Sequence, residues 1–281
     1  MNVLKVSCNG IMLVLSLTML PACHNSGNID TASEETNSDI IKKEVILSPE
    51  TQDLLNRIPT PFEVTLVLHE AKAPYIFSLT NPPANVNRYF TEKTKALNLG
   101  IYSIDLAYSS TYRRISETEK FLYCTGKLAQ DLGIGGVYDK TLVEKISNCG
   151  DNRDSLISLV KRTFGETSDC LRRNNRNQVA VLVASGAFVE GVYIACSLCQ
   201  LTKDNSLIAA IIFRQQESLS KLLRILGEYG TDSTIKPVAG NLAALKAIFT
   251  GYGLGSGKTL SPQNVAGIIE IVSKVRSSMI R

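Results

Sequence analysis

From Ser48 onward, apolar residues recur at spacings of three and four, which is the period of an amphipathic α-helix. The clearest stretch places Leu97, Ile101, Ile104 and Tyr108 on one face. The strict alternation of apolar and polar residues that is typical of β-strands is almost absent from the chain. The pattern therefore predicts an all-α fold, an antiparallel helical bundle of eight to ten helices.

Several local signals predict where these helices begin and end. Ser48-Pro49-Glu50 combines a capping serine, a proline at the first helical position and an acid. Asn81-Pro82-Pro83 interrupts the chain, Ser116–Glu119 has the spacing of a capping box, and Gly133 ends the helix that follows it. Further helices are predicted at 139–148, 153–164, 168–201 with a break near 174–177, 205–229, 239–250 and 262–280.

The first 23 residues have the pattern of an export signal. Lys5 is the only charged residue before residue 30, and an apolar run covers residues 11–20. This run is too short to cross a hydrocarbon layer of about 30 Å. Leu20-Pro21-Ala22-Cys23 resembles the lipobox of bacterial lipoproteins. The resemblance implies that residues 1–22 are a lipoprotein signal peptide and that Cys23 is acylated and becomes the first residue of the mature chain.

The polar composition of the next segment predicts a lipid-anchored flexible tether at 23–47, before an all-α domain at 48–281. Anchoring through the N-terminal lipid places the protein at the membrane, and we expect the outer membrane. No acidic run follows Cys23, which favours an orientation toward the periplasm. Val179–Leu201 is the most apolar later segment, but Glu190 lies at its centre, so we expect a buried core helix rather than a membrane span.

Composition and charge exclude several classes of function. The chain has 281 residues, 44% of them hydrophobic, and a net charge of +4. Its weak positive balance without a basic stripe argues against nucleic-acid binding. With two histidines and no second cysteine pair near Cys196 and Cys199, we expect no metal site and no cofactor. Gly251–Thr259 resembles a phosphate-binding loop, but it lacks the first glycine and follows a predicted helix, so we expect no nucleotide there.

Five cysteines would remain after loss of Cys8 and lipidation of Cys23. In an exported protein these thiols can pair or stay free. The sequence leaves open whether all are free or one disulfide forms among Cys124, Cys149, Cys170, Cys196 and Cys199.

Two acids in apolar helical segments are the main candidates for chemistry. Asp105 and Glu190 have mostly apolar neighbours, and a buried carboxylate must be paired, hydrogen-bonded or protonated. One interpretation is a small-ligand pocket between two central helices, formed by Tyr102, Asp105, Tyr108, Glu190 and Tyr193. The other is structural, with each acid holding a backbone end, a tyrosine or an arginine such as Arg113, Arg114 or Arg214.

The same segments raise the hypothesis of an internal repeat. Asp105 and Tyr108 share the spacing acid-x-x-Tyr with Glu190 and Tyr193, 85 residues later. Two pseudo-repeated halves, 85–165 and 166–281, would each start with such a helix. Alternatively, the match reflects the general self-similarity of helical bundles.

Four segments are similar to those of helical lipoproteins of unknown function from Bacteroidota: Leu97–Tyr108, Lys127–Ile134, Asp151–Ile157 and Gly186–Ala195. The resemblance implies a helical fold and an envelope location, and it implies no reaction. We therefore expect a non-catalytic interaction or structural lipoprotein with an envelope protein as partner. The alternative is a small-ligand-binding lipoprotein that uses the pocket between the central helices.

Overall fold

The computed structural model describes residues 47–51, 62–149, 152–202, 205–252 and 260–281, which belong to one compact unit, Glu44–Arg281. The predicted signal peptide, Cys23 and all of the tether except Leu47 lie outside the described residues. Most of the glycine-rich stretch Gly251–Thr259 lies outside them as well.

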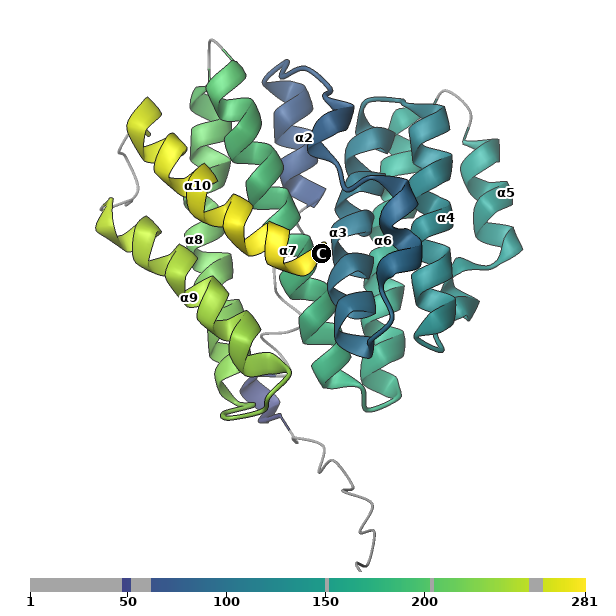
Figure 1. Ribbon diagram of the computed structural model, residues 1–281. Coiled ribbons are helices and arrows are strands. Elements are labelled where there is room, and N and C mark those ends of the chain that lie inside the picture. The colour runs from purple at the N-terminus through teal and green to yellow at the C-terminus, as the bar shows by residue number, and fades with distance from the viewer. Residues whose placement is uncertain (1–46, 52–61, 150–151, 203–204, 253–259) are drawn as a thin grey trace, which may run out of the picture. The chain divides into compact units, whose positions relative to one another are not determined.

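The described residues form helices and no strand, which confirms the predicted all-α class (Figure 1). Nine α-helices fall within these ranges, in the predicted interval of eight to ten. They are α2 (Phe62–Glu70), α3 (Glu92–Thr111), α4 (Ile115–Asp131), α5 (Lys140–Asn148), α6 (Arg153–Arg173), α7 (Asn177–Leu201), α8 (Ser206–Gly227), α9 (Ile235–Gly251) and α10 (Pro262–Met279). Three short 3-10 helices accompany them: η1 (Phe77–Leu79), η2 (Pro83–Arg88) and η3 (Gly135–Tyr138).

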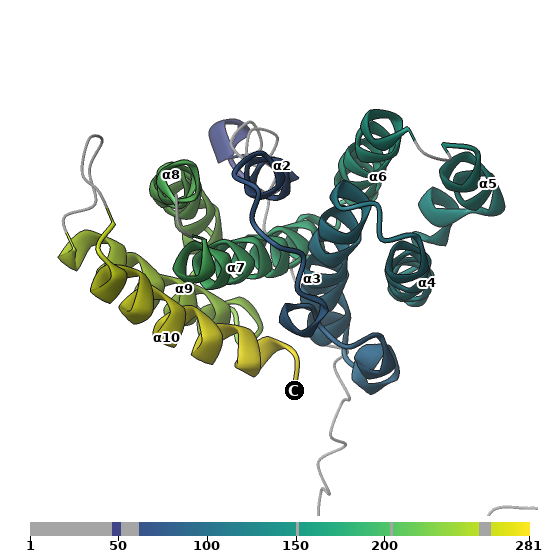
Figure 2. The same ribbon diagram turned by 90° about the horizontal axis from the view of Figure 1, so that it is seen from above.

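Helices α3 and α7 form the central pair, and the others pack around them (Figure 2). Helices α4 and α6 pack against α3, whereas α8 and α10 pack against α7. The first helix of each proposed half is thus central, and its second and fourth helices lie on it. Helix α2 contacts α3, α7 and α8. This shared order agrees with the hypothesis of two halves, although the duplication itself stays a prediction.

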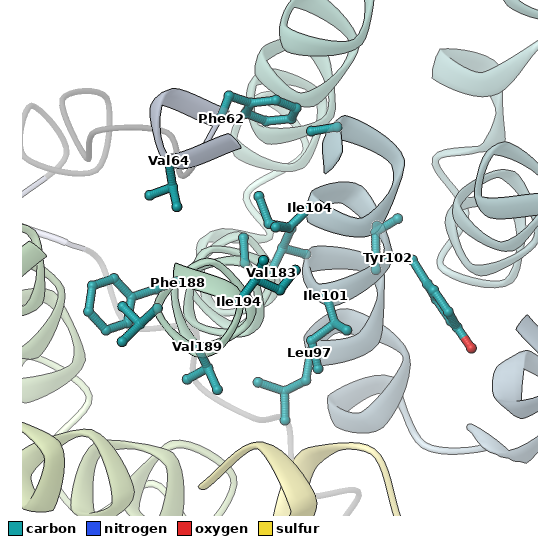
Figure 3. Packing of buried hydrophobic residues seen from close by; sticks show 14 of the residues in the cluster. Phe62, Val64, Leu97, Ile101, Tyr102, Ile104, Val183, Phe188, Val189 and Ile194 are labelled. Atoms are coloured by element: carbon teal, nitrogen blue, oxygen red, sulfur yellow. The ribbon is translucent and has the colours of Figure 1, made fainter. Parts of the chain in front are cut away.

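The two central helices meet at a pair of glycines. A Cβ atom on Gly100 would lie 2.0 Å from the carbonyl oxygen of Val183, and one on Gly186 would lie 1.9 Å from that of Leu97. Both distances are far below van der Waals contact, so the backbones of α3 and α7 touch directly at this crossing. Large apolar side chains then fill the space on either side of it (Figure 3).

The most apolar helix of the described residues lies inside the fold. Helix α7 alone among them is long and apolar enough to cross a membrane by length and composition, and 89% of its most apolar window is buried in the protein. This burial agrees with the expectation of a core helix. Its apolar side chains, including Val183, Phe188 and Val189, belong to the main hydrophobic core.

The predicted capping box at Ser116–Glu119 is wrong. Helix α4 already begins at Ile115, and its N-cap residue Arg114 provides no side-chain cap. The reason is the sharp reversal after α3, where Arg113 adopts a left-handed φ of 55° and the backbone N–H of Arg114 donates to the carbonyl of Ser109 at 2.9 Å. A capping box forms instead at the start of α3, between Thr91 and Thr94.

The predicted interruption between residues 164 and 168 is also wrong. Helix α6 continues without a break to Arg173, because Val160, Phe164, Thr167 and Leu171 form one continuous buried face across this segment. The break expected near 174–177 is confirmed, with Asn175 in the left-handed region at a φ of 57°. Helix α9 begins four residues earlier than predicted, where Asp232 Oδ1 accepts a hydrogen bond from the N–H of Ile235 at 3.0 Å.

The predicted helix start at Ser48 is confirmed, and it is fastened to the end of α8. Ser48 Oγ accepts a hydrogen bond from the N–H of Thr51 at 3.2 Å. The N–H and hydroxyl of Ser48 donate to the two carboxylate oxygens of Glu228, at 3.1 and 2.9 Å, and the Thr51 hydroxyl donates to the same carboxylate. Arg224 adds an ion pair with Glu50 at 2.7 Å.

Candidate functional site

The fold brings the two candidate acids together between the central helices. Asp105 of α3 and Glu190 of α7 have no exposed surface, and they lie close enough for the charge of Glu190 to raise the pKa of Asp105. Asp105 Oδ2 also accepts a hydrogen bond from the backbone N–H of Asn81 at 3.0 Å. The two carboxyl groups therefore form one cluster rather than two separate sites.

The cation of this cluster comes from the last described helix. Arg276 of α10 binds both oxygens of Glu190, through Nε at 2.5 Å and through a terminal nitrogen at 2.8 Å. The same guanidinium donates to the carbonyl of Leu79 at 3.1 Å and lies 4.4 Å from the ring centre of Tyr193. The sequence-based suggestion of Arg113, Arg114 or Arg214 is wrong for Glu190, because α10 supplies the partner.

The candidate tyrosines of α3 fasten residues 71–91, the connection that crosses this helix. The hydroxyl of Tyr102 donates to the carbonyl of Pro82 at 2.9 Å, and that of Tyr108 donates to the carbonyl of Pro74 at 3.1 Å. The Tyr108 hydroxyl also accepts from the N–H of Ile76 at 2.9 Å. Burial raises the pKa of Tyr108 to about 12, so its hydroxyl stays protonated and available as a donor at neutral pH.

Two asparagines extend the network, and sequence reasoning missed both. The side-chain amide nitrogen of Asn81 donates to the hydroxyl of Tyr89 at 2.9 Å and to Asn98 Oδ1 at 3.2 Å. That of Asn98 donates to the carbonyl of Met279 at 2.8 Å, near the end of α10. Asn98 lies between Leu97 and Leu99 in an apolar stretch, and this polar residue could have indicated a buried hydrogen bond.

The cluster is a closed part of the core. Its carboxyl groups and the rings of Tyr102 and Tyr108 have no solvent-exposed surface, and Tyr193 is only half-buried beside Arg276. Burial, followed by repulsion from Glu190, raises the pKa of Asp105 well above its ordinary value, while the positive charge of Arg276 lowers it in part. Such an arrangement holds helices together, and a ligand would reach it only if the core opened.

An open apolar groove lies elsewhere, between α4 and α5. Its volume is about 1130 Å³, and none of the five candidate residues lines it. Three lining side chains are unusually exposed for their type: Ile115 at 51%, Tyr123 at 65% and Val143 at 48%. Leu122, Ile146 and Leu156 also line the groove.

The groove exists because α4 has two apolar faces. One face carries Phe121, Cys124 and Leu128 into the core, and the other carries Ile115, Leu122 and Tyr123 along the groove. Spacings of seven and eight residues place the second set on one side of a helix. This spacing was the sequence signal for the groove, and it was hidden because the core-facing residues give the same helical period.

The remaining candidate chemistry is sparse in the described part of the chain. There, no group of three or more His, Cys, Asp or Glu side chains is placed to hold a metal ion. Five cysteines are free in the same residues: Cys124, Cys149, Cys170, Cys196 and Cys199.

No protein-family model matches the sequence, and comparisons with curated proteins and with solved structures found no significant match.

Proposed function

We propose that this protein is a lipid-anchored, non-catalytic protein of the cell envelope that binds an amphipathic helix of a partner protein in the groove between α4 and α5. The observation that carries the proposal is the second apolar face of α4, which faces solvent at Ile115 and Tyr123. Exposed contiguous apolar surface of this kind is typical of a binding site.

The dimensions of the groove favour a helix over a small molecule. Its lining residues on α4 extend from Ile115 to Gln130, which corresponds to about 22 Å along a helix axis. A volume of about 1130 Å³ exceeds the range of about 300–1,000 Å³ that is usual for small-molecule pockets. A helix of about 15 residues with apolar side chains on one face matches this length.

The charged residues of the groove suggest a direction for the bound helix. Glu119 and Lys127 both line the groove and lie two turns apart on α4. A partner helix with a basic residue near Glu119 and an acidic residue near Lys127 is complementary to this order. Lys127 also forms an ion pair with Asp131 at 3.6 Å, which keeps its ammonium group near that end of α4.

The location rests on the lipobox-like sequence that ends at Cys23. We propose an outer-membrane anchor with the helical domain facing the periplasm. Substitution Cys23→Ala should abolish labelling by radioactive palmitate and release the protein into the soluble fraction. Protease added to intact cells should leave the wild-type protein uncut, and digestion should require permeabilised cells. Continued labelling of the variant would refute acylation at Cys23.

Two model peptides test the groove directly. Both are fluorescein-labelled 16-residue helices with the same leucine face, and they differ only in the order of their lysine and glutamate residues. We expect tighter binding of the complementary peptide by fluorescence anisotropy, and loss of binding in the double variant Tyr123→Glu, Val143→Glu. Leu207→Glu is the matched control, since Leu207 is an exposed apolar residue of α8 at 49% that does not line the groove.

The same groove variant distinguishes a helical partner from a small ligand. Palmitate binding that the groove variant abolishes, combined with no binding of either peptide, would refute a helical partner and favour a lipid-like ligand. The alternative pocket of Tyr102, Asp105, Tyr108, Glu190 and Tyr193 has less support, because four of these five side chains lie in the closed core.

A further inference from the structure

We propose that Asp105 and Glu190 share one proton, so that together with Arg276 they form an electrically neutral cluster that fastens α10 and residues 71–91 to the central helices. The inference is independent of the groove and of the lipid anchor. It concerns a proton-dependent device within the core.

The hydrogen bonds assign the charges. Both oxygens of Glu190 accept from the guanidinium of Arg276, which is the bonding of an ionised carboxylate with its counterion. Asp105 Oδ2 accepts from Asn81, whereas the buried Oδ1 accepts from no described donor. Two ionised carboxylates this close in the core would repel each other, and no described cation or donor reaches Asp105 Oδ1 to offset that repulsion. A proton on Asp105 Oδ1, donated toward Glu190, satisfies this oxygen.

The charge balance leads to the same assignment. Two ionised carboxylates beside one guanidinium would leave a net negative charge where neither acid has any exposed surface. Such a charge is costly in a medium of low polarity, and neighbouring carboxyl groups avoid it by retaining one proton. With one proton retained, the negative charge of Glu190 and the positive charge of Arg276 cancel.

The other titratable groups around Asp105 are neutral at physiological pH. Burial raises the pKa of Cys124 on α4 and of Tyr108 on α3, each to about 12. Burial also raises the pKa values of Tyr75 and Tyr102, on the connection and on α3. The cation that faces Asp105 is Arg276, and the ring centre of Tyr193 of α7 lies 4.4 Å from its guanidinium. Burial raises the pKa of Tyr89 of the connection as well.

The cluster joins four parts of the chain. Asp105 lies on α3 and Glu190 on α7, Arg276 reaches them from α10, and the connection contributes the N–H of Asn81 and the carbonyl of Leu79. Ionisation of Asp105 would place a second negative charge inside all these contacts. We therefore expect α10 and the connection to respond first when the proton is lost.

The pH dependence has a definite sign. The folded state raises the pKa of Asp105, whereas the unfolded chain has the ordinary value of about 4. The stabilising contribution of the retained proton is complete below about pH 4 and is lost as the pH rises through the folded value. Within this window, the unfolding equilibrium constant should increase about tenfold per pH unit from this residue alone.

Substitution Asp105→Asn provides the main test. The amide can donate to Glu190 as the protonated carboxyl does, and it cannot ionise. Urea unfolding, followed by circular dichroism between pH 5 and 9, should show that Asp105→Asn becomes more stable relative to the wild-type protein as the pH rises. The ratio of the two unfolding constants should change by up to tenfold per pH unit. Asp154→Asn is the matched control on the surface of α6 and should leave the pH dependence unchanged. Equal pH dependence in Asp105→Asn and the wild type would overturn the proposal.

Two spectroscopic measurements keep the test independent of stability. Infrared spectra at neutral pH should show the carbonyl band of a buried protonated carboxylic acid in the wild type, and this band should disappear in Asp105→Asn. Amide hydrogen exchange in α10, compared between the two proteins at each pH, should accelerate selectively in the wild type as the pH rises. Absence of the carboxylic acid band from the wild type would overturn the proposal.

Substitution Glu190→Gln tests whether Asp105 keeps its proton because it shares it with Glu190 or because Asp105 is buried. Without the Glu190 carboxylate, Asp105 becomes the available counterion for Arg276 and should ionise, so the carboxylic acid band should vanish. A folded Glu190→Gln protein that retains the band would show that burial alone protonates Asp105, which contradicts sharing. If this variant does not fold, the Asp105→Asn comparison and the wild-type band decide the question.

Discussion

Substitution of alanine for Gly100 or Gly186 would push the two central helices apart. The new methyl group would lie 2.0 Å from a carbonyl oxygen of α7 in the first case and 1.9 Å from one of α3 in the second. Both distances are about 1.4 Å or more short of ordinary contact at 3.4 Å. The obstructing atoms belong to helix backbones, which cannot rotate away as a flexible side chain could.

The expected cost follows from two opposing terms. Alanine favours the helix over glycine by about 1 kcal/mol. Overpacking of a buried site costs about 1–3 kcal/mol and occasionally more, and a clash with backbone belongs at the upper end. We therefore expect each substitution to lower the free energy of unfolding by about 2 kcal/mol or more. The double variant should lose less than the sum, because the first methyl group already separates the helices that the second would meet.

Urea unfolding monitored by circular dichroism measures these changes. The matched control is Gly165→Ala in α6, where an added methyl group meets no atom within 4 Å. This control should stabilise the protein by about 0.5–1 kcal/mol. If Gly100→Ala and Gly186→Ala were as stable as Gly165→Ala, the helices would not touch as described and the reasoning would fail.

Three further predictions concern single contacts. Ser261→Ala removes the hydroxyl that accepts from the N–H of Asn264 at the start of α10, and it should cost about 1 kcal/mol in urea unfolding; no change would show that this cap does not stabilise the helix. Tyr108→Phe leaves the N–H of Ile76 without its hydroxyl acceptor and should cost about 1–3 kcal/mol in thermal or urea unfolding, and a neutral result would contradict the role of this hydroxyl. Burial raises the pKa of Cys199 to about 11, so at pH 8 a thiol reagent should reach this residue only on unfolding. The same reagent should modify the half-buried Cys149 and Cys170 of the folded protein. Rapid reaction of Cys199 in the folded protein would show that α7 is accessible.

The helical period predicted the fold class well because most helices bury one face, but helix ends depended on contacts that the sequence does not display. The break before α7 was predictable from its run of polar residues. The start of α4 was not, since it depends on the left-handed backbone of Arg113 and on the short reversal after α3. The continuity of α6 likewise depends on the tertiary packing that buries its face from Val160 to Leu171.

For the candidate cluster, too, the sequence predicted some features and not others. The apolar surroundings of Asp105 and Glu190 predicted burial, and a shared pocket was one of two interpretations, but nothing in the sequence showed that the two acids lie close together. Their cation could not be predicted, because Arg276 is 86 residues from Glu190 and no local pattern marks it. The groove was missed for a different reason, since Ile115 and Tyr123 lie on a helix whose core-facing residues already explain its period.

The fastening of Ser48 and Thr51 to Glu228 has a mechanical consequence. Tension applied to the chain ahead of Leu47 would pass through these hydrogen bonds to the C-terminal end of α8. Helix α8 packs against α7, so the load would reach the central pair through side-chain packing. A pull at this point would therefore load the attachment to Glu228 and the buried side chain of Leu47 first.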